Sequence, residues 1–335
     1  MRRLGLLTGG GDCAGLNAAI RAVVKTASID AGAEVLGFRD GFRGLVDDDA
    51  VWLTYDMVSN VLTQGGTLLG TTRDHFFAVP GNGADHSTND RTQQAVEVFR
   101  KHQLDALVCV GGDGTLTVAT ALQQRGIPIV GIPKTIDNDV AGSDVAIGFD
   151  TAVWVAAASM DRLHSTAASH HRVMIVETMG RTAGWVALYA GVASGADVIL
   201  IPEIPFTVDG ILRVIHERMH RGRHFSIIAL AEGAGHGEAL AQEIERRSGQ
   251  ESRAVVLGHL QRGGGPTPAD RLLATRLGYE ASHVALAGRS GVAVCWNDCG
   301  VHEIPLVDIA GHRRLVDEHS ALVKTARAVG TSFGE

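Results

Sequence analysis

The sequence has few cysteines, no long apolar run and no excess of positive charge. Its four cysteines include no CxxC pair, and Cys109 falls in a predicted buried strand, so we expect a reduced, cytoplasmic protein. No apolar stretch approaches the roughly 20 residues that a membrane-spanning helix needs. The formal net charge of −7 argues against nucleic acid or an anionic membrane as the main partner, so any anion site must be local.

The length and the hydrophobic content of the sequence are sufficient for two hydrophobic cores. Its 335 residues are 45% hydrophobic and 20% charged, which is typical of a globular protein large enough to form two domains. The first residues lead from two arginines directly into a predicted strand at residues 4–8. They lack the apolar core and the cleavage site of a signal peptide.

A glycine-rich turn stands between a predicted strand at residues 107–110 and a predicted helix at residues 116–124. It consists of Gly111, Gly112, Asp113, Gly114 and Thr115. The glycines would let the turn take positive φ angles and bring backbone N–H groups close to an anion, and the helix N-terminus adds positive potential. Because the carboxylate of Asp113 would repel a phosphate, Mg²⁺ is the natural cation between them. The alternative is a tight turn capped by Asp and Thr.

A similar strand, turn and helix open the chain. The predicted strand at residues 4–8 is followed by the glycine-rich turn at residues 9–12 and by an alanine-rich helix at residues 14–31. We expect both turns at the carboxyl ends of parallel strands, where α/β sheets bind ligands. Neither turn matches the dinucleotide fingerprint or the Walker phosphate loop.

Polar residues follow a third predicted strand, at residues 128–133. They are Lys134, Thr135, Ile136, Asp137, Asn138 and Asp139, with one apolar member among them. One aspartate could accept a proton from a substrate hydroxyl while the other anchors the loop or metal-bound waters. An Asx-rich turn is the alternative. Arg73, which ends another glycine-rich loop, could reach a phosphate or could be an ordinary surface arginine.

The rest of the chain alternates between strands and helices. Further strands are predicted at residues 34–38, 172–177, 196–201, 225–231 and 293–296, and further helices at residues 91–102, 208–219, 270–288 and 320–329. After the last helix we expect a short, disordered polar end.

Five motifs, taken together, resemble those of the 6-phosphofructokinase family. They are Gly-Gly-Gly-Asp at residues 9–12, Gly-Gly-Asp-Gly-Thr at residues 111–115, Pro-Lys-Thr-Ile-Asp-Asn-Asp at residues 133–139, Met-Gly-Arg at residues 179–181 and Leu-Gly-His-Leu-Gln-Arg-Gly-Gly at residues 257–264. The resemblance implies two Rossmann-like three-layer α/β/α domains with mostly parallel sheets. Residues 1–148 plus 261–311 would form the nucleotide- and magnesium-binding domain, and residues 149–260 plus 312–335 the sugar-phosphate-binding domain.

The resemblance also implies a reaction: phosphoryl transfer from ATP, with Mg²⁺, to the 1-hydroxyl of fructose 6-phosphate, a step of glycolysis. The implied nucleotide-phosphate site comprises Gly11, Arg73, Asp74, Gly112, Asp113, Gly114 and Thr115, with Asp113 holding the metal. The implied catalytic residues are Gly114, Lys134, Thr135, Asp137 and Arg181. Asp137 would be the general base that takes the proton of the attacking hydroxyl, while cations screen the phosphates.

The implied sugar-phosphate site draws on the second half of the chain. It comprises Thr135, Ile136, Asp137, Met179, Gly180, Arg181, Glu232, His259, Leu260, Gln261 and Arg262, and Arg172 and Arg253 would reach in from a neighbouring subunit. Several arginines suit a doubly charged phosphate. A site completed in trans requires an oligomer, either a homotetramer or a dimer.

Two residues point to different phosphoryl donors. Pyrophosphate-using members of the family carry Asp at the position of Gly114 and Lys at the position of Lys134, whereas many ATP users have Gly at the latter. We give Gly114 more weight, because a carboxylate there would exclude ATP, whereas a lysine only adds favourable charge. An ATP-using, actinobacterial-type subgroup combines this glycine with this lysine. A pyrophosphate-dependent or dual-donor enzyme and a non-catalytic nucleotide- or sugar-phosphate-binding regulator remain the alternatives.

Overall fold

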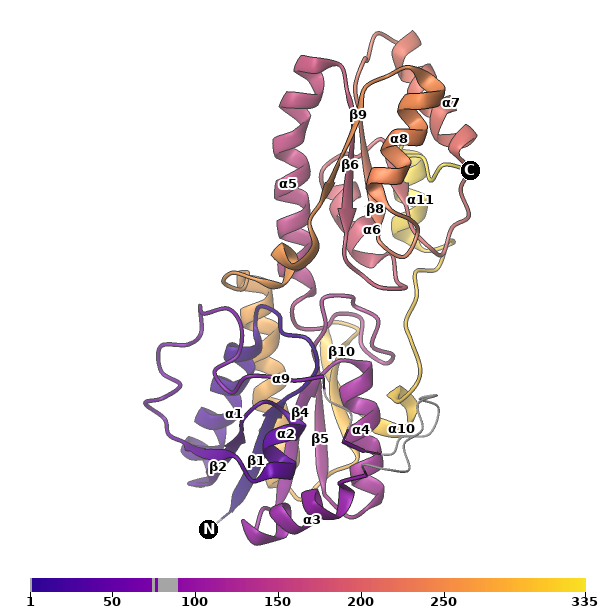
Figure 1. Ribbon diagram of the computed structural model, residues 1–335. Helices are drawn as coiled ribbons and strands as arrows, with labels where there is room; N and C mark the ends of the chain where they lie inside the picture. Colours follow the sequence, from indigo (N-terminus) through magenta and orange to yellow (C-terminus); the bar gives the residue numbers. More distant parts are fainter. Residues whose placement is uncertain (1, 74–75, 78–89) are drawn as a thin grey trace. The chain divides into compact units, whose positions relative to one another are not determined.

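The computed structural model describes residues 2–73, 76–77 and 90–335, and the chain divides into two compact units (Figure 1). The first unit comprises Met1–Thr135, Asp139–Gly148 and Arg262–Arg313. The second comprises Ile136–Asn138, Phe149–Gln261 and Arg314–Glu335. Neither unit is a continuous segment of the chain.

The first unit is built on a seven-stranded sheet. In spatial order its strands are β11 (Gly300–Pro305), β10 (Val292–Asn297), β5 (Ile129–Pro133), β4 (Ala106–Gly111), β1 (Arg3–Thr8), β2 (Glu34–Phe38) and β3 (Ala50–Leu53). The five inner strands are parallel, and β3 and β11 pair antiparallel at the two edges. The sequence predicts the five parallel strands but not these two edge strands.

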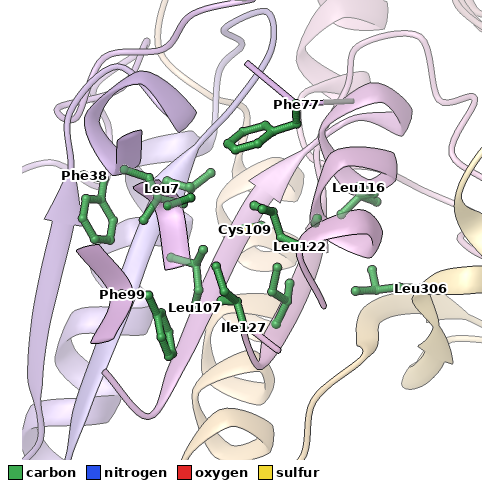
Figure 2. Close-up of a cluster of buried hydrophobic side chains, with 14 of the residues drawn as sticks. Leu7, Phe38, Phe77, Phe99, Leu107, Cys109, Leu116, Leu122, Ile127 and Leu306 are labelled. Atoms are coloured by element: carbon green, nitrogen blue, oxygen red, sulfur yellow. The ribbon is translucent and has the colours of Figure 1, made fainter. Parts of the chain in front are cut away.

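Helices cover both faces of this sheet. On one face α1 (Leu16–Ala31) packs against α9 (Pro268–Leu286) so closely that a Cβ at Gly278 would lie 2.7 Å from the Cβ of Ala22. The helices of the other face are α2 (Phe42–Asp47), α3 (Thr92–Lys101), α4 (Asp113–Gln124) and α10 (Leu306–Ile309). Beneath them lies a core that includes Phe38, Leu107 and Leu122 (Figure 2).

The second unit has a wholly parallel sheet of four strands. They run in the order β7 (Val198–Leu200), β8 (Ser226–Ala231), β6 (Val173–Thr178) and β9 (Ser252–Val256). The helices are α5 (Phe149–His170), α6 (Trp185–Ala193), α7 (Val208–His220), α8 (Gly237–Ser248) and α11 (Ala321–Ala328). They sandwich the sheet, so the predicted three-layer α/β/α class with mostly parallel sheets is confirmed.

Four features of the second unit differ from expectation, and two of them, the strand β9 and the helix α8, are elements for which the sequence gives no prediction. The long helix α5 is not predicted, because three of its six buried residues are alanine and its buried face therefore gives little apolar contrast. The predicted disordered end is wrong: Ser332 forms a parallel bridge with Val198, and the side chain of Phe333 is buried. The buried side chain of Phe333 and backbone hydrogen bonds between Ser332 and residues 197 and 199 together bind this segment to the unit.

Candidate active site

Three turns lie side by side at one edge of the seven-stranded sheet. The strands β1, β4 and β5 are neighbours and run parallel, so the residues that follow their carboxyl ends share that edge. These residues are Gly9 to Asp12 after β1, Gly112 to Thr115 after β4, and Lys134 and Thr135 after β5. The structure thus brings together most of the residues predicted to bind the phosphoryl donor.

The turn after β4 is tighter than the sequence predicts. Helix α4 begins at Asp113, and none of Gly111, Gly112 and Gly114 has a positive φ, so that part of the prediction is wrong. The glycine at position 111 serves a different purpose, since a Cβ there would collide with the side chain of Thr115. A Cβ at Gly114, on the exposed first turn of α4, would meet nothing within 4 Å.

Asp113 offers a single carboxylate at the start of α4. Its Oδ1 accepts hydrogen bonds from the backbone N of Gly311 (3.2 Å) and from Thr117 Oγ1 (3.4 Å), and its Oδ2 lies 3.9 Å from Arg313 Nε. No cluster of three or more metal-ligating side chains occurs among the described residues. One carboxylate fits Mg²⁺, which commonly takes one or two protein oxygens and completes its shell with water and substrate phosphates.

The turn after β1 is held through its carbonyl groups. Lys134 Nζ donates to Gly9 O (2.9 Å) and also to Gly11 O. Thr71 Oγ1 donates to Gly10 O at 2.6 Å. Lys134, predicted as a catalytic residue, is itself 2% exposed. The side chain that follows β5 therefore ties two of the three turns together.

Two guanidinium groups lie against Gly11. A Cβ at this position would collide with Arg262 Nη1 and stand 2.8 Å from Arg73 Nη2, so a side chain here would displace these guanidinium groups. Arg262 Nη1 also donates to Asp12 O at 3.0 Å. Arg73, predicted for the nucleotide-phosphate site, thus lies beside Gly11, and Arg262, predicted to bind the sugar phosphate, is in the same unit. Asp74 lies outside the described residues.

Cys13 directly follows this turn, and its position makes it inert. The thiol is buried, and burial raises its pKa to about 12 although the Lys134 ammonium acts in the opposite direction. A thiol that stays protonated at neutral pH is a poor nucleophile. Cys13 is therefore a packing residue of the turn.

The chain leaves the first unit directly after Thr135. Ile136, Asp137 and Asn138 belong to the second unit, and all three are buried. Asn138 takes a left-handed conformation (φ 54°), and its carbonyl accepts a hydrogen bond from Arg314 Nη1 (3.4 Å). The predicted general base, Asp137, thus lies in a short buried segment.

In the second unit the turn after β6 is held through its amide groups. Gln261 Oε1 accepts from the backbone N of Met179 (2.7 Å). Glu232 Oε1, at the end of β8, accepts from the backbone N of Gly180 (3.1 Å) and of Arg181 (2.7 Å). Arg181 is exposed and has a φ of 52°, a strained conformation that these hydrogen bonds maintain. The structure thus gathers five of the residues predicted for the sugar phosphate.

Arg172 and Arg253 lie elsewhere in this unit. Arg172 precedes β6, whereas Arg181 follows its carboxyl end, so the two arginines belong to opposite ends of that strand. Both Arg172 and Arg253 pair with Glu251 at 2.7 Å, and the hydrogen bond from Arg172 lowers the pKa of that carboxyl. A single chain does not bring these arginines to the turn at Met179.

The remaining predicted residues lie on a short 3₁₀ helix, Gly258–Arg262, after β9. His259 and Leu260 are exposed, whereas Gln261 is buried and also donates from Nε2 to Ala152 O (3.4 Å). Gln261 is therefore occupied with backbone groups.

Sequence reasoning missed Thr71 and Asp270. Thr71 lies two residues before Arg73, and no local pattern indicates that its hydroxyl binds Gly10. Asp270 is fully buried near the start of α9, and its Oδ1 accepts from the backbone N of Gly148 (2.9 Å). The segment Thr267-Pro268-Ala269-Asp270, a helix-start signal with Pro at the first position, could have indicated it.

Comparisons with known proteins identify the family of this chain. The phosphofructokinase family profile matches residues 3–285. The chain is 46% identical to "ATP-dependent 6-phosphofructokinase" of Chloroflexus aggregans (100% of this chain, 98% of the relative) and 45% identical to "ATP-dependent 6-phosphofructokinase 3" of Bacteroides thetaiotaomicron (99% and 100%). The chain belongs to the phosphofructokinase family.

Solved structures give the same fold. The phosphofructokinase of Pichia pastoris superimposes with a TM-score of 0.84 at 32% identity, over 92% of this chain and 35% of that longer chain. The pyrophosphate-dependent enzyme of Marinobacter aquaeolei superimposes with a TM-score of 0.85 at 24% identity, over 99% and 88%, which is a likeness of fold. Within the described residues, none of the helices has the length and apolar character needed to traverse a bilayer.

Proposed function

We propose that this chain is an ATP-dependent 6-phosphofructokinase, which transfers the terminal phosphoryl group of ATP to the 1-hydroxyl of fructose 6-phosphate and releases ADP. The observation that carries the proposal is the shared edge of β1, β4 and β5, where two glycine-rich turns and a helix N-terminus meet. Such an edge binds phosphates. The names of the relatives supply the donor and the acceptor.

The first unit would bind the donor. The N-terminus of α4, the turn at Gly11 and the guanidinium of Arg73 provide positive potential for the phosphates of ATP. Asp113 would hold Mg²⁺ together with water and phosphate oxygens, and the ion would offset the charge of the transferred group. In this unit the protein mainly positions the nucleotide and screens the charge of its phosphates.

The second unit would bind the acceptor and supply the base. As the 1-oxygen of the sugar forms its bond to the terminal phosphorus, the carboxylate of Asp137 takes the hydroxyl proton, and the bond to the ADP oxygen breaks. Arg181 would neutralise charge on the substrates, and the second oxygen of Glu232 could accept from sugar hydroxyls. The low exposure of Asp137 would limit the access of water to the base.

A complete sugar-phosphate site would require a second subunit. The six residues of β6 separate Arg172 from Met179, a span of roughly 20 Å. Arg172 and Arg253 would therefore reach the sugar phosphate of a neighbouring subunit, as the resemblance implies. We propose a homo-oligomer, a tetramer or a dimer. The unpaired cysteines of the described chain support a cytoplasmic location.

The donor is tested by assaying fructose 1,6-bisphosphate formation with ATP and, separately, with pyrophosphate. We expect activity with ATP. Because a side chain at position 114 meets nothing within 4 Å, Gly114→Asp should fold normally and place a carboxylate beside the nucleotide. Like-charge repulsion should then lower kcat/KM for ATP by roughly 100-fold or more. Activity of the unmodified protein with pyrophosphate alone would favour the second candidate, the pyrophosphate-dependent enzyme.

A further inference from the structure

Lys134 is a charged side chain to which the proposed reaction assigns no role. It follows β5 and is 2% exposed, and a buried ammonium is stable only when its donors are satisfied. Two of its hydrogen bonds go to the carbonyl oxygens of Gly9 and Gly11. The ammonium group of Lys134 thus binds the backbone of the turn that follows β1.

The other carbonyl groups of this turn are held in the same way. Thr71 Oγ1 donates to Gly10 O and Arg262 Nη1 donates to Asp12 O, so four successive carbonyls accept from side chains of other segments. In a trans peptide the N–H points away from the C=O of the same unit. Fixing the carbonyls of Gly10 and Gly11 therefore fixes the direction of the N–H groups of Gly11 and Asp12.

A turn with fixed amide directions is a preorganised anion site. Successive backbone N–H groups that point the same way form a concave site for phosphate oxygens. Without Lys134, the Gly9 and Gly11 carbonyls would lose a cationic donor and the turn could rotate its peptide planes at little cost, since glycine permits many conformations. Lys134 would then strengthen the binding of the nucleotide and would not select between ATP and pyrophosphate as the phosphoryl donor.

We propose that Lys134 is a positioning residue that holds the turn at Gly9 to Gly11 for the phosphates of the nucleotide, and that it does not select between ATP and pyrophosphate. This inference rests on the proposed function. The competing role, neutralising the transferred phosphoryl group, predicts contact with a group that ADP lacks. Binding of ADP therefore separates the two roles.

The test is a calorimetric titration of the full-length protein with MgADP, and separately with fructose 6-phosphate. Lys134→Met removes the donors and keeps the length of the side chain, and Lys324→Met, on the exposed side of α11, is the control. We expect Lys134→Met to weaken ADP binding by about 10- to 100-fold, as the loss of hydrogen bonds from a charged donor predicts. The affinity for fructose 6-phosphate and the ratio of ATP to pyrophosphate activity should stay unchanged.

Thr71→Val provides a second variant that leaves Lys134 in place. It removes only the hydroxyl that donates to Gly10 O, and we expect ADP binding to weaken by about 3- to 10-fold. If Lys134→Met does not fold, Thr71→Val still tests the premise of the inference, that side-chain donors to the carbonyls of this turn support ADP binding.

Wild-type ADP affinity in either folded variant would overturn the inference, as would a changed donor ratio in Lys134→Met. A protein that binds ADP through this turn but does not phosphorylate fructose 6-phosphate would refute the proposed function and leave the role of Lys134 standing.

Discussion

The two units hold their ligand turns in opposite ways. In the first unit, side-chain donors hold the carbonyls of Gly9, Gly10 and Gly11. In the second, side-chain acceptors hold the amides of Met179, Gly180 and Arg181. A turn whose carbonyls are bound can present its N–H groups to an anion, whereas a turn whose amides are bound presents side chains instead. The first arrangement suits polyphosphate, and the second suits a sugar ring contacted by Arg and Glu.

The largest effect should come from the two carboxylates that the units contribute. Asp137→Asn keeps the shape of the base but cannot accept the proton, so we expect kcat to fall by roughly 10²- to 10⁴-fold with fructose 6-phosphate affinity unchanged. Asp113→Asn should instead raise the Mg²⁺ concentration required for half-maximal rate. Steady-state kinetics over a Mg²⁺ series measures both. An equal fall in kcat at saturating Mg²⁺ in both variants would contradict the separate roles proposed for the two carboxylates, Asp137 as the base and Asp113 as the Mg²⁺ ligand.

The next largest effect should come from the turn Met179 to Arg181, whose amide groups are bound by Gln261 and Glu232. Glu232→Gln keeps the size of the side chain but loses the charge that binds two amides, so Arg181 should leave its strained conformation more readily. We expect the KM for fructose 6-phosphate to rise by about 10-fold or more. ADP affinity should not change. Glu238→Gln, at an exposed position of α8, is the matched control. A rise in the KM for ATP instead would contradict the division between the turns.

A smaller effect should separate two glycines of one turn. Gly111→Ala forces a collision with Thr115, and overpacking of this kind typically costs about 1–3 kcal/mol of the free energy of unfolding. Gly114→Ala adds a methyl group in open space on a helix, where alanine is favoured by up to about 1 kcal/mol. Urea unfolding of both variants measures the difference. An equally large loss of stability in Gly114→Ala would mean that its neighbourhood is not open.

The smallest effect is a loss of stability in alkali. Burial raises the pKa of Cys13 and of Cys295 to about 12, from an ordinary value of 9.0. Above pH 9 the unfolded chain releases these protons while the folded chain keeps them, so the free energy of unfolding falls as the pH rises from 9 toward 12. At pH 9 the loss is about 0.4 kcal/mol per thiol.

Urea unfolding at pH 8 and pH 9.5 measures this decline, and Cys13→Ala combined with Cys295→Ala should reduce it. The second unit, residues 136–138, 149–261 and 314–335, contains no cysteine and cannot contribute to it. An unchanged decline in the double variant would assign it to other groups.

All parallel strands except β9 were predictable, because they are short apolar runs bounded by glycine or polar turns, as β4 and β5 are. The strand β9 begins with Ser252 and Arg253 and is only partly buried. The edge strand β3 was not predictable, because it is only partly buried and has just four residues. Helix α5 escaped prediction because an alanine-rich buried face resembles a surface in hydropathy. Sequence patterns predict an element from the contrast between its apolar and polar positions, and β3 and α5 have little such contrast.

The α/β class, the family and the residues at the turns follow from strand periodicity and the five motifs, which are local properties of the chain. The contacts between those residues follow only from the tertiary fold. Lys134 and Gly9 are 125 residues apart, and Glu232 and Arg181 are 51 residues apart. Their hydrogen bonds depend on which strands become neighbours, and that depends on the packing of whole sheets.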